Sequence, residues 1–364
     1  MRIGFDAKRL FLNNTGLGNY SRTLVRNLVK YFPQHEYFLY SPKVEKNQST
    51  QFFFDQDNVK IVSPKDGGGA LWRSRGVLKE ISKDKLDVYH GLSNELPYGL
   101  GQLDTKAVVT IHDIIFERYP RQYGVFDRMM YRHKTRKAIV SADRVISISH
   151  QTTDDLVKYY QAPSGKLSLL YQSCNPSFTD APSPLTVQEN DYFLYVGSVI
   201  ERKNLLAILE ALHILTKDKR KKLLIVGTGT KYFKKAKDFV AKHQLDTWVE
   251  WKGALDNSAL RELYENAIAL IYPSIFEGFG IPVIESMFAG RPVITSNLSS
   301  LKEAGGKAAL LIDPFKVEEL ALAMEQICDP KVQEDLLSKI PKHLEQFDPE
   351  KLSKQLIDIY QSIL

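Results

Sequence analysis

Short runs of apolar residues and longer stretches with helical periodicity alternate along the first half of the chain. Residues 16–32 repeat apolar side chains four positions apart, at Leu24 and Leu28 and at Val25 and Val29, as in an amphipathic helix. Strands that alternate with helices predict a parallel, doubly wound α/β sheet. We expect strands at residues 2–6, 36–40, 59–62, 87–90, 107–112, 145–148 and 167–170, and further helices at 71–81 and 149–160.

A polar stretch interrupts this pattern at residues 179–190, which are rich in Pro, Ser, Thr and Asp. Such a composition between apolar segments is typical of a linker between domains. The alternation then restarts and predicts a second parallel, doubly wound sheet. We expect its strands at residues 192–196, 222–226, 249–251 and 267–272, its helices at 204–215, 231–243 and 258–266, and a final amphipathic helix at 349–364.

Length and composition agree with two domains. A chain of 364 residues, 43% of them hydrophobic, is long enough to bury two cores. The net charge of +6 suits anionic substrates or a phospholipid surface and is too weak to indicate a nucleic-acid-binding protein. Cys174 and Cys328 match no metal-ligand spacing, and a reducing compartment fits them best. Since neither a signal peptide nor a membrane-spanning apolar run is found, we expect a cytoplasmic protein.

The stretch 267–296 carries the strongest chemical signal. Its apolar run ends at Pro273, and a glycine-bearing loop then leads to Ile281 and Pro282, where proline suits the first turn of a helix. Free backbone N–H groups and the positive end of a helix dipole at one point suit a phosphate or diphosphate.

Two carboxylates, Glu277 and Glu285, lie on either side of this helix start, eight positions apart. One can face a sugar and the other a ribose. By pattern alone, it is an equally good interpretation that Glu285 complements the helix dipole and that Glu277 is a solvated loop residue.

The run EGFGIPVIESMFAGRPVITS, residues 277–296, resembles the signature of the retaining glycosyltransferases of family 4. In that family two glutamates in an E-x7-E motif flank a GFG-type loop, and a G-x-P-V turn follows. The resemblance implies the GT-B fold: two doubly wound, Rossmann-like domains that face an interdomain cleft, with a C-terminal helix that crosses back to the first domain. We therefore expect an acceptor-side domain at 1–178 with 350–364, a linker at 179–190 and a donor-binding domain at 191–349.

The same resemblance implies that this loop and helix start bind a nucleotide diphosphate sugar. Glu277 is expected at the sugar hydroxyls and Glu285 at the ribose. The donor contacts implied here are Glu277, Gly278, Phe279, Gly280, Ile281 and Glu285.

Two adjacent cations, Arg202 and Lys203, lie at a strand-to-helix turn. Cations at a helix start oppose its dipole, and a bound anion would explain them; the alternative is that they are surface charges. The segment 197–204 resembles the family's G-x-x-x-x-x-K-[GN] stretch, in which an arginine and a lysine hold the donor phosphates. Ser198 stands where an arginine is common, so the resemblance implies that Arg202 and Lys203 make the phosphate contact.

Further donor contacts are expected from glycine turns after other strands. Gly16 and Gly18, in NNTGLG, resemble the family's first-strand glycine loop, whose backbone approaches the diphosphate; Thr15 stands where a glycine is usual, and a helix-initiating turn is the alternative. Gly227 and Leu255 resemble positions near the nucleotide base.

Two histidines, His90 and His112, end predicted strands and so point towards the ligand side of a sheet, although a hydrogen-bonded core histidine is the alternative. The run VVTIHDI resembles the family's strand-end histidine. It implies that His112 lies at the hydroxyls of the reacting sugar and that Asp113 orients this ring or touches the acceptor. His90 resembles a second histidine with a structural or acceptor-side role.

The function implied by the resemblance is transfer of a hexose, of mannose or glucose type, from a nucleotide diphosphate sugar with retention of configuration. GDP-mannose is our first choice of donor, and a glycan or lipid-linked molecule in bacterial cell-surface polysaccharide biosynthesis is the expected acceptor. We expect no metal and no cofactor, because cations and helix-start amides stabilise the leaving phosphate. The expected catalytic residues are His112, Glu277, Arg202 and Lys203. A nucleotide-sugar-binding subunit without turnover and a GT-B sugar-nucleotide epimerase remain open.

A basic helix face is predicted at Arg128, Arg132 and Arg136, which are four positions apart. Such a face is most often solvated. The alternative is contact with anionic lipid headgroups, which would place the protein peripherally at the inner face of a membrane. The segment lacks a wide apolar stripe of Trp, Phe and Leu.

Overall fold

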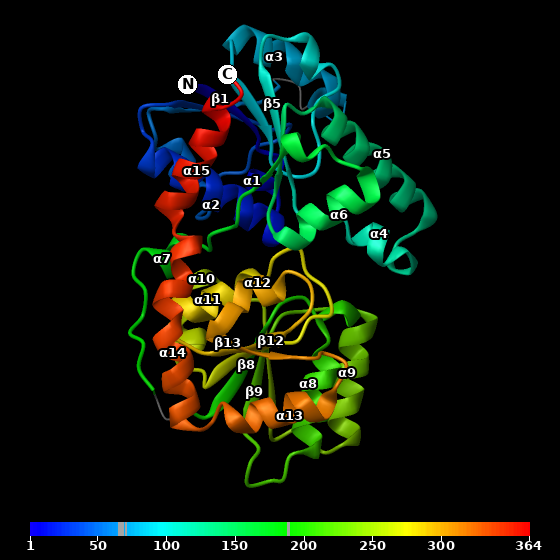
Figure 1. The fold of residues 1–364 in the computed structure, drawn as a ribbon, viewed down its shortest axis with the longest axis vertical. Coiled ribbons are helices and arrows are strands. Elements are labelled where there is room, and N and C mark those ends of the chain that lie inside the picture. Colours follow the sequence, from blue (N-terminus) through cyan, green and yellow to red (C-terminus); the bar gives the residue numbers. More distant parts are fainter. Residues whose placement is uncertain (65–68, 70, 188–189) are drawn as a thin grey trace. The chain divides into compact units, whose positions relative to one another are not determined.

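The computed structural model describes residues 1–64, 69, 71–187 and 190–364 (Figure 1). The chain divides into two compact units. Unit 1 comprises Met1–Ser173 and Phe347–Leu364, and unit 2 comprises Cys174–Gln346. Each unit contains one sheet in which every strand pair is parallel, so both are α/β units of the doubly wound kind predicted from the alternating pattern.

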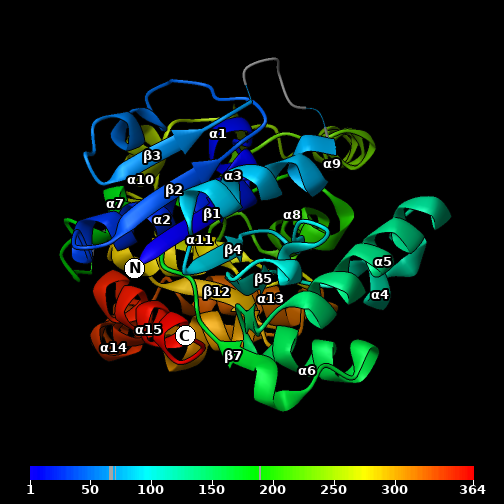
Figure 2. The same cartoon turned by 90° about the horizontal axis from the view of Figure 1, so that it is seen from above.

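The sheet of unit 1 has seven strands in the order β3-β2-β1-β4-β5-β6-β7. The chain builds outward from β1 to β3 and then returns to add β4 on the other side of β1. Strands β1, β2 and β3 lie side by side in Figure 2. The strands are β1 (Arg2–Asp6), β2 (Glu36–Tyr40), β3 (Val59–Val62), β4 (Val88–Gly91), β5 (Lys106–Ile111), β6 (Arg144–Ser147) and β7 (Leu167–Leu169). The α-helices are α1 (Lys8–Leu12), α2 (Gly16–Tyr31), α3 (Val77–Asp84), α4 (Ile115–Arg118), α5 (Val125–Ser141), α6 (His150–Tyr160) and α15 (Pro349–Gln361).

Two segments of unit 1 differ from the sequence prediction. The stretch between β1 and α2 contains a short helix, α1, which buries Leu10 and Phe11 and which the periodicity did not indicate. The helix expected at residues 71–81 is a π-helical turn at Trp72–Gly76 followed by α3. A π-helical turn widens the backbone spiral, so the side chains of this segment leave the register of a regular helix.

The sheet of unit 2 has six strands in the order β10-β9-β8-β11-β12-β13. The order reverses between β8 and β11, as it does between β1 and β4 in unit 1. The strands are β8 (Tyr192–Val196), β9 (Lys222–Val226), β10 (Val249–Gly253), β11 (Ala269–Tyr272), β12 (Val293–Ser296) and β13 (Ala309–Ile312). The α-helices are α7 (Pro176–Thr179), α8 (Leu205–Ile214), α9 (Lys231–Lys242), α10 (Asn257–Glu265), α11 (Ile281–Phe288), α12 (Leu301–Gly305), α13 (Val317–Gln326) and α14 (Pro330–Leu344).

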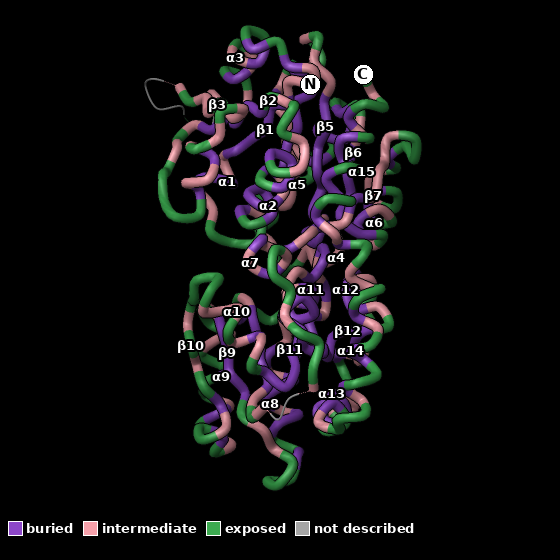
Figure 3. Tube along the Cα trace, turned by 90° about the vertical axis from the view of Figure 1, so that its left-hand side faces the viewer, coloured by how far each residue is buried: buried purple, intermediate pink, exposed green. Residues whose placement is uncertain are grey.

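Apolar strands form the centre of each unit. The tube in Figure 3 is mostly buried along β1, β5 and β6 of unit 1 and along β11 and β12 of unit 2. Of these strands, β1, β5, β6 and β11 were predicted from the sequence, because a parallel strand with helices on both faces has no solvent side and is therefore apolar.

The last helix, α15, belongs to unit 1. Its Leu352, Leu356, Ile357 and Tyr360 enter the core formed with β1 and α2. Near the expected linker, α7 packs against α10 and α11 and so belongs to unit 2. Residues 188–189 of the expected linker lie outside the described residues. Among the helices of the described ranges, none has both the length and the apolar character that crossing a bilayer requires.

Candidate functional site

The reversal of strand order in unit 2 brings two loops together at the carboxyl ends of β8 and β11. Ligands of open α/β sheets bind at such switch points. The loop after β8 contains a short 3₁₀ turn at Glu201–Lys203, and the loop after β11 contains Glu277. The backbone N–H of Ile275 donates to the carbonyl oxygen of Arg202 at 2.8 Å, so the two loops are joined directly.

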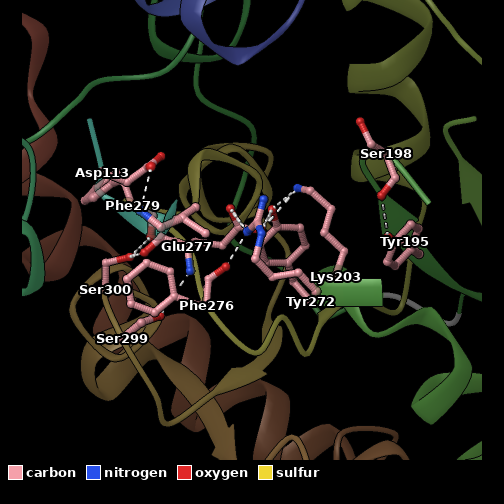
Figure 4. Close-up of polar contacts among 12 residues, drawn as sticks. Asp113, Tyr195, Ser198, Lys203, Tyr272, Phe276, Glu277, Phe279, Ser299 and Ser300 are labelled. Atoms are coloured by element: carbon pink, nitrogen blue, oxygen red, sulfur yellow. Dashed lines mark hydrogen bonds and ion pairs between the residues drawn. The ribbon is translucent and has the colours of Figure 1, made fainter. Parts of the chain in front are cut away.

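Arg202, Lys203 and Glu277 form one ion-pair cluster at this point. Figure 4 shows Lys203 and Glu277 of this cluster together with Tyr272. Nη1 of Arg202 lies 2.8 Å from Oε2 of Glu277, and Nζ of Lys203 lies 3.3 Å from Oε1. Tyr272, the last residue of β11, donates its hydroxyl to Oε1 of Glu277 at 3.1 Å and accepts from Nζ of Lys203. The three charged side chains are each about 15% exposed or less, so their charges act through little intervening water.

The two cations keep Glu277 ionised. Burial alone would raise the pKa of this carboxyl, but the charges of Lys203 and Arg202 outweigh burial and lower the pKa to about 2. A carboxylate with such a low pKa accepts hydrogen bonds well and is a poor proton acceptor at neutral pH.

The turn that carries the cations is held by Asn204. Asn204 has a left-handed backbone, with φ +58°, and its Nδ2 donates to the carbonyl oxygen of Pro314 at 2.8 Å. Arg202 and Lys203 thus lie in a separate turn before α8. The sequence suggested that these cations occupy the start of a helix, where the dipole opposes them, but the structure does not place them there.

Close backbone contacts require glycine at two strand ends. Gly227, after β9, has φ +148°, and a Cβ atom there would lie 1.9 Å from the carbonyl oxygen of Gly197, after β8. Gly197 itself has φ +139°, and a Cβ would lie 3.0 Å from Nζ of Lys203. Side chains at these positions would push the β8 and β9 loops apart and displace Lys203.

The loop before α11 is fastened to the start of α12. The Ser300 hydroxyl lies 2.8 Å from the carbonyl oxygen of Glu277 and 2.9 Å from that of Phe279. Gly280 precedes α11 with φ +117°, and Ile281 and Pro282 form its first turn. Gly280 thus turns the chain from the loop that carries Glu277 directly into α11.

Glu285, one turn further along α11, has a different environment. Its Oε2 accepts a hydrogen bond from the Tyr264 hydroxyl at 3.0 Å. Burial, and after it the charge of Glu285, raises the pKa of the Cys174 thiol. Burial raises the pKa of Glu285 to about 7, although Tyr264 and the charge of Lys203 act in the opposite direction.

The remaining unit 2 residues expected at the donor lie at the same edge of the sheet. Gly227 follows β9, and Leu255, 38% exposed, follows β10. Gly278 and Phe279 lie in the loop before α11, and Phe279 is buried.

In unit 1, Gly16 and Gly18 form the first turn of α2, after Thr15. The Asn13 side chain accepts hydrogen bonds from the backbone N–H groups of Thr15 and Gly18, at 2.9 and 3.1 Å. A Cβ at Gly18 would lie 1.7 Å from the Asn13 carbonyl oxygen, whereas one at Gly16 would meet no atom within 4 Å. The loop therefore needs a glycine at position 18 for steric reasons and leaves the backbone at position 16 open.

His112 follows β5 and is 6% exposed. Its Nε2 donates to the Leu92 carbonyl oxygen at 2.8 Å, which leaves Nδ1 to accept from Nε2 of Gln172 at a long 3.3 Å. Burial lowers the pKa of His112 to about 4, against the effect of the Leu92 carbonyl, so the ring is neutral at pH 7. Asp113 accepts from the backbone N–H of Ile115 at 3.2 Å, at the start of α4.

His90 lies fully inside the core of unit 1. Nδ1 is 2.6 Å from the Tyr360 hydroxyl of α15, and Nε2 is 2.8 Å from the Thr110 hydroxyl. Both ring nitrogens are therefore engaged within the fold, which favours the structural one of the two roles expected for His90. The ring links β4 to β5 and to the last helix.

Several residues of the unit 2 site were not identified from the sequence. Tyr272 is the last residue of an apolar strand. A tyrosine at a strand end can place its hydroxyl in the site, so its position in the sequence could have indicated this role. Asn204 ends the 197–204 segment that resembles the family's stretch, but no role was expected for it. Tyr264 and Ser300 reach the site only through the packing of α10 and α12, and nothing in their spacing indicated it.

Metal-ligand geometry is not present in the described part of the chain: no group of three or more His, Cys, Asp or Glu side chains there lies close enough to hold an ion. One Asp-x-Asp triplet does occur, at Asp55 and Asp57. The Asp55 carboxylate accepts from Nε2 of Gln51 at 2.8 and 2.9 Å, at the end of a 3₁₀ turn in unit 1.

The fold and this cluster define a class of protein: GT-B proteins, in which cations and helix-start amides at a sheet switch point can hold a phosphorylated ligand. Sequence comparison agrees and goes further. Residues 14–178 match the family described as Glycosyltransferase Family 4, and residues 178–343 match the family described as Glycosyl transferases group 1. The chain belongs to the GT-B glycosyltransferases and is similar to those of family 4.

Individual relatives cover two thirds of the chain or more. O-antigen chain mannosyltransferase B of Escherichia coli is 25% identical over 99% of this chain and 100% of the relative. O-antigen chain mannosyltransferase RfbU of Salmonella typhimurium is 27% identical over 68% of this chain and 67% of its own length. Among solved structures, Anabaena HepE in complex with UDP-glucose has the same fold, with a TM-score of 0.73 over the full length of both chains at 14% identity.

Proposed function

We propose that unit 2 binds a nucleotide diphosphate sugar and that the enzyme transfers its hexose with retention of configuration and without a metal ion. The observation that carries this proposal is the cluster of Arg202, Lys203 and Glu277, in which Glu277 lies in the loop that leads into α11. It combines two cations for a diphosphate with a permanently charged acceptor for sugar hydroxyls.

The chemical step breaks the bond between the anomeric carbon and the diphosphate oxygen. Negative charge develops on the leaving phosphate, and the guanidinium of Arg202, the ammonium of Lys203 and the first amides of α11 stabilise it. The acceptor oxygen forms its new bond on the face that the diphosphate leaves, and the leaving phosphate takes the acceptor proton. Glu277 binds sugar hydroxyls in this scheme and is neither base nor nucleophile, consistent with its pKa of about 2.

Two further residues position the donor in this proposal. Glu285 accepts hydrogen bonds from the ribose hydroxyls, which requires its ionised form. His112 exchanges its long hydrogen bond from Gln172 for a hydroxyl of the reacting sugar, with Nδ1 as acceptor and Nε2 still bound to Leu92.

The names of the two enterobacterial relatives support mannose as the sugar, and we propose GDP-mannose as the donor. A glycan or lipid-linked molecule of bacterial cell-surface polysaccharide biosynthesis is the proposed acceptor. A UDP-sugar is the second candidate, supported by the UDP-glucose complex of HepE.

Release of nucleoside diphosphate from GDP- and UDP-sugars tests the proposal directly. We expect release with one donor class, and we expect Lys203→Ala and Glu277→Ala to lower it by about 100-fold or more, as removal of a transition-state donor does in other enzymes. Lys235→Ala, an exposed lysine of α9, is the matched control and should retain full activity. Activity should persist with a metal chelator, and the product anomer should match the donor.

The competing functions give different results in the same assay. Tight binding of a nucleotide sugar without release would favour a binding subunit, and interconversion of the nucleotide sugar would favour an epimerase. An inverted product anomer would contradict the proposed mechanism while leaving the transferase class intact.

We further propose that α5 contacts an anionic membrane. The helix exposes apolar side chains near its amino end: Phe126 is 88% exposed, Val125 63% and Met129 61%. Arg128, Arg132 and Arg136 lie beside them at helical spacing. Exposed apolar side chains next to arginines suit an interface with anionic headgroups. The composition alone did not indicate this exposed apolar group.

A further inference from the structure

Unit 1 contains a pocket at its own switch point, away from every residue assigned above. It has a volume of about 290 Å³. The pocket is lined by Asp6, which ends β1, by Lys8, which follows it, and by residues 95–98, which follow β4. Because strand order reverses between β1 and β4, this is the place in the sheet where a ligand is expected.

Arg73 forms ion pairs with both carboxylates of the pocket. Its Nε donates to Oδ2 of Asp6 at 2.8 Å, and its Nη1 lies 2.5 Å from Oε2 of Glu95. Lys134 of α5 reaches the other Glu95 oxygen at 2.9 Å. The π-helical turn that carries Arg73 is also tied to the β4 loop, because the Tyr98 N–H donates to the Ser74 carbonyl oxygen at 2.7 Å. The pocket is thus built by four segments that fix one another.

The charges that line the pocket do not cancel. Four cations, at Lys8, Arg73, Lys134 and Lys137, face two carboxylates, at Asp6 and Glu95, which leaves a net charge of +2 (4 − 2). Arg73 and Lys134 are satisfied by the carboxylates.

Lys8 and Lys137 have no carboxylate partner among the residues that the structure describes. Nζ of Lys137 instead lies over the Tyr98 ring, 3.7 Å from its centre, where the ring holds the charge at the side of the pocket. Lys8 and Lys137, without a carboxylate partner in the described part of the chain, lie beside the ion pairs of Arg73 and Lys134. Two such cations are suited to bind an anionic ligand.

Size and charge together limit the ligand. A volume of about 290 Å³ is at the lower end of the range of small-molecule sites, roughly 300–1,000 Å³, so it accommodates one sugar-sized or phosphate-sized group and no extended glycan. We propose that this pocket binds a phosphate-bearing group of the acceptor, with Lys8 and Lys137 as its cations. The phosphate belongs either to a phosphorylated sugar or to the diphosphate that joins a glycan to a lipid. This inference rests on the proposed function, in which unit 1 receives the acceptor.

Lysine labelling read by mass spectrometry tests the pocket residue by residue. The protein is treated with an amine-acetylating reagent alone or with inorganic pyrophosphate, mannose 1-phosphate, or the uncharged methyl α-mannoside. We expect the two phosphate probes to slow labelling of Lys8 and Lys137 by several-fold, and methyl α-mannoside to leave it unchanged. Lys158, which lies over the Tyr159 ring at 5.2 Å outside the pocket, is the matched internal reference and should label equally throughout.

A variant and a lipid probe complete the experiment. In the wild type, pyrophosphate should also slow labelling of Lys134, which lines the same pocket. In the Lys8→Gln/Lys137→Gln variant, which keeps the Arg73 ion pairs, this protection of Lys134 should be lost. Farnesyl diphosphate in phosphatidylcholine vesicles that protects at lower concentration than mannose 1-phosphate would identify a lipid diphosphate, and the reverse order a phosphorylated sugar. Either order supports the inference.

Two results would overturn it: equal labelling of Lys8 and Lys137 with and without every phosphate probe, or equal protection by methyl α-mannoside. Failure here is distinguishable from failure of the proposed function, since nucleoside diphosphate release depends on unit 2 residues and is measured separately.

Discussion

Glu277 and Glu285 lie eight positions apart, and the fold gives them opposite electrostatic environments. Glu277 lies between two cations and has a pKa of about 2, whereas Glu285 is desolvated beside Tyr264 and has a pKa of about 7. Pairs of carboxyls whose pKa values are driven apart commonly serve different roles in one site. At neutral pH, Glu277 is permanently charged and Glu285 titrates.

The free energy of unfolding should depend on pH because the pKa of Glu285 is raised in the folded protein. The folded protein binds a proton more tightly than the unfolded chain, whose carboxyl has a pKa near 4.5. The stability that this group contributes is therefore present below pH 4.5 and is lost as the pH rises through about 7. The free energy of unfolding of the wild type, relative to Glu285→Gln, should fall across this range by up to about 3 kcal/mol, measured by urea denaturation. A difference that does not vary with pH would show that the pKa is not raised.

Donor binding should have the opposite pH dependence if Glu285 accepts from the ribose. Binding would then need the carboxylate, so affinity for nucleoside diphosphate should rise with pH through about 7 and level off above it. Glu285→Gln should bind more weakly and with a flat profile between pH 6 and 8. Calorimetric titration at several pH values would check this, and Tyr264→Phe would serve as a variant that keeps the carboxylate but removes its hydrogen bond.

At the scale of single elements, the loop and first turn of α2 provide a contrast between two glycines. An alanine at Gly18 would place Cβ against the Asn13 carbonyl oxygen, while one at Gly16 has open space. We expect Gly18→Ala to destabilise unit 1 by about 1–3 kcal/mol and Gly16→Ala to leave the melting temperature within about 2 °C. Thermal unfolding followed by circular dichroism measures both.

The same pair of variants separates packing from ligand binding. If the backbone at Gly16 approaches the donor diphosphate, Gly16→Ala should weaken nucleotide binding without a loss of stability. If instead both variants melt and bind like the wild type, the close contact at position 18 does not constrain the loop.

The sequence predicted elements correctly where apolar residues form a continuous run. It failed to predict elements whose formation depends on other parts of the chain. The buried strands β8, β9 and β11 lie where the apolar runs predicted them. The π-helical turn at Trp72–Gly76 and the short helix α1 were not predicted, because each depends on contacts with other segments and not on local periodicity.

At the scale of the whole molecule, the chain forms two α/β units, and α15 closes the core of unit 1. Tyr360 of α15 reaches the ring of His90, 270 residues earlier in the chain. The C-terminal segment is therefore part of the hydrophobic core of unit 1, although the intervening residues 174–346 form unit 2.

The whole protein is expected to associate with anionic membranes through α5. We expect co-sedimentation with vesicles rich in anionic phosphatidylglycerol at low salt, and a several-fold decrease at high salt because the arginine contribution is screened. Phe126→Ser/Met129→Ser should reduce binding at every salt concentration, since it removes the apolar contribution. Leu322→Ser/Phe315→Ser, at exposed apolar residues of unit 2, is the control. Equal binding to phosphatidylcholine vesicles, or none to either, would contradict the proposal.

The sequence by itself determined the parallel α/β class, the seven strands of unit 1 and the strands β8 to β11 of unit 2, because a strand that is buried on both faces is read as an apolar run. Its resemblance to family 4 also led to the expectation that Arg202 and Lys203 contact the donor phosphates and that Glu277 contacts the sugar hydroxyls. Only the tertiary structure decided that Glu277 is clamped by both cations while Glu285 is left to titrate, and that Lys8, Arg73 and Lys137 meet in one pocket. These outcomes depend on which strand ends become neighbours, and that is set by the reversal of strand order and by long-range packing, for which residue spacing along the chain carries no signal.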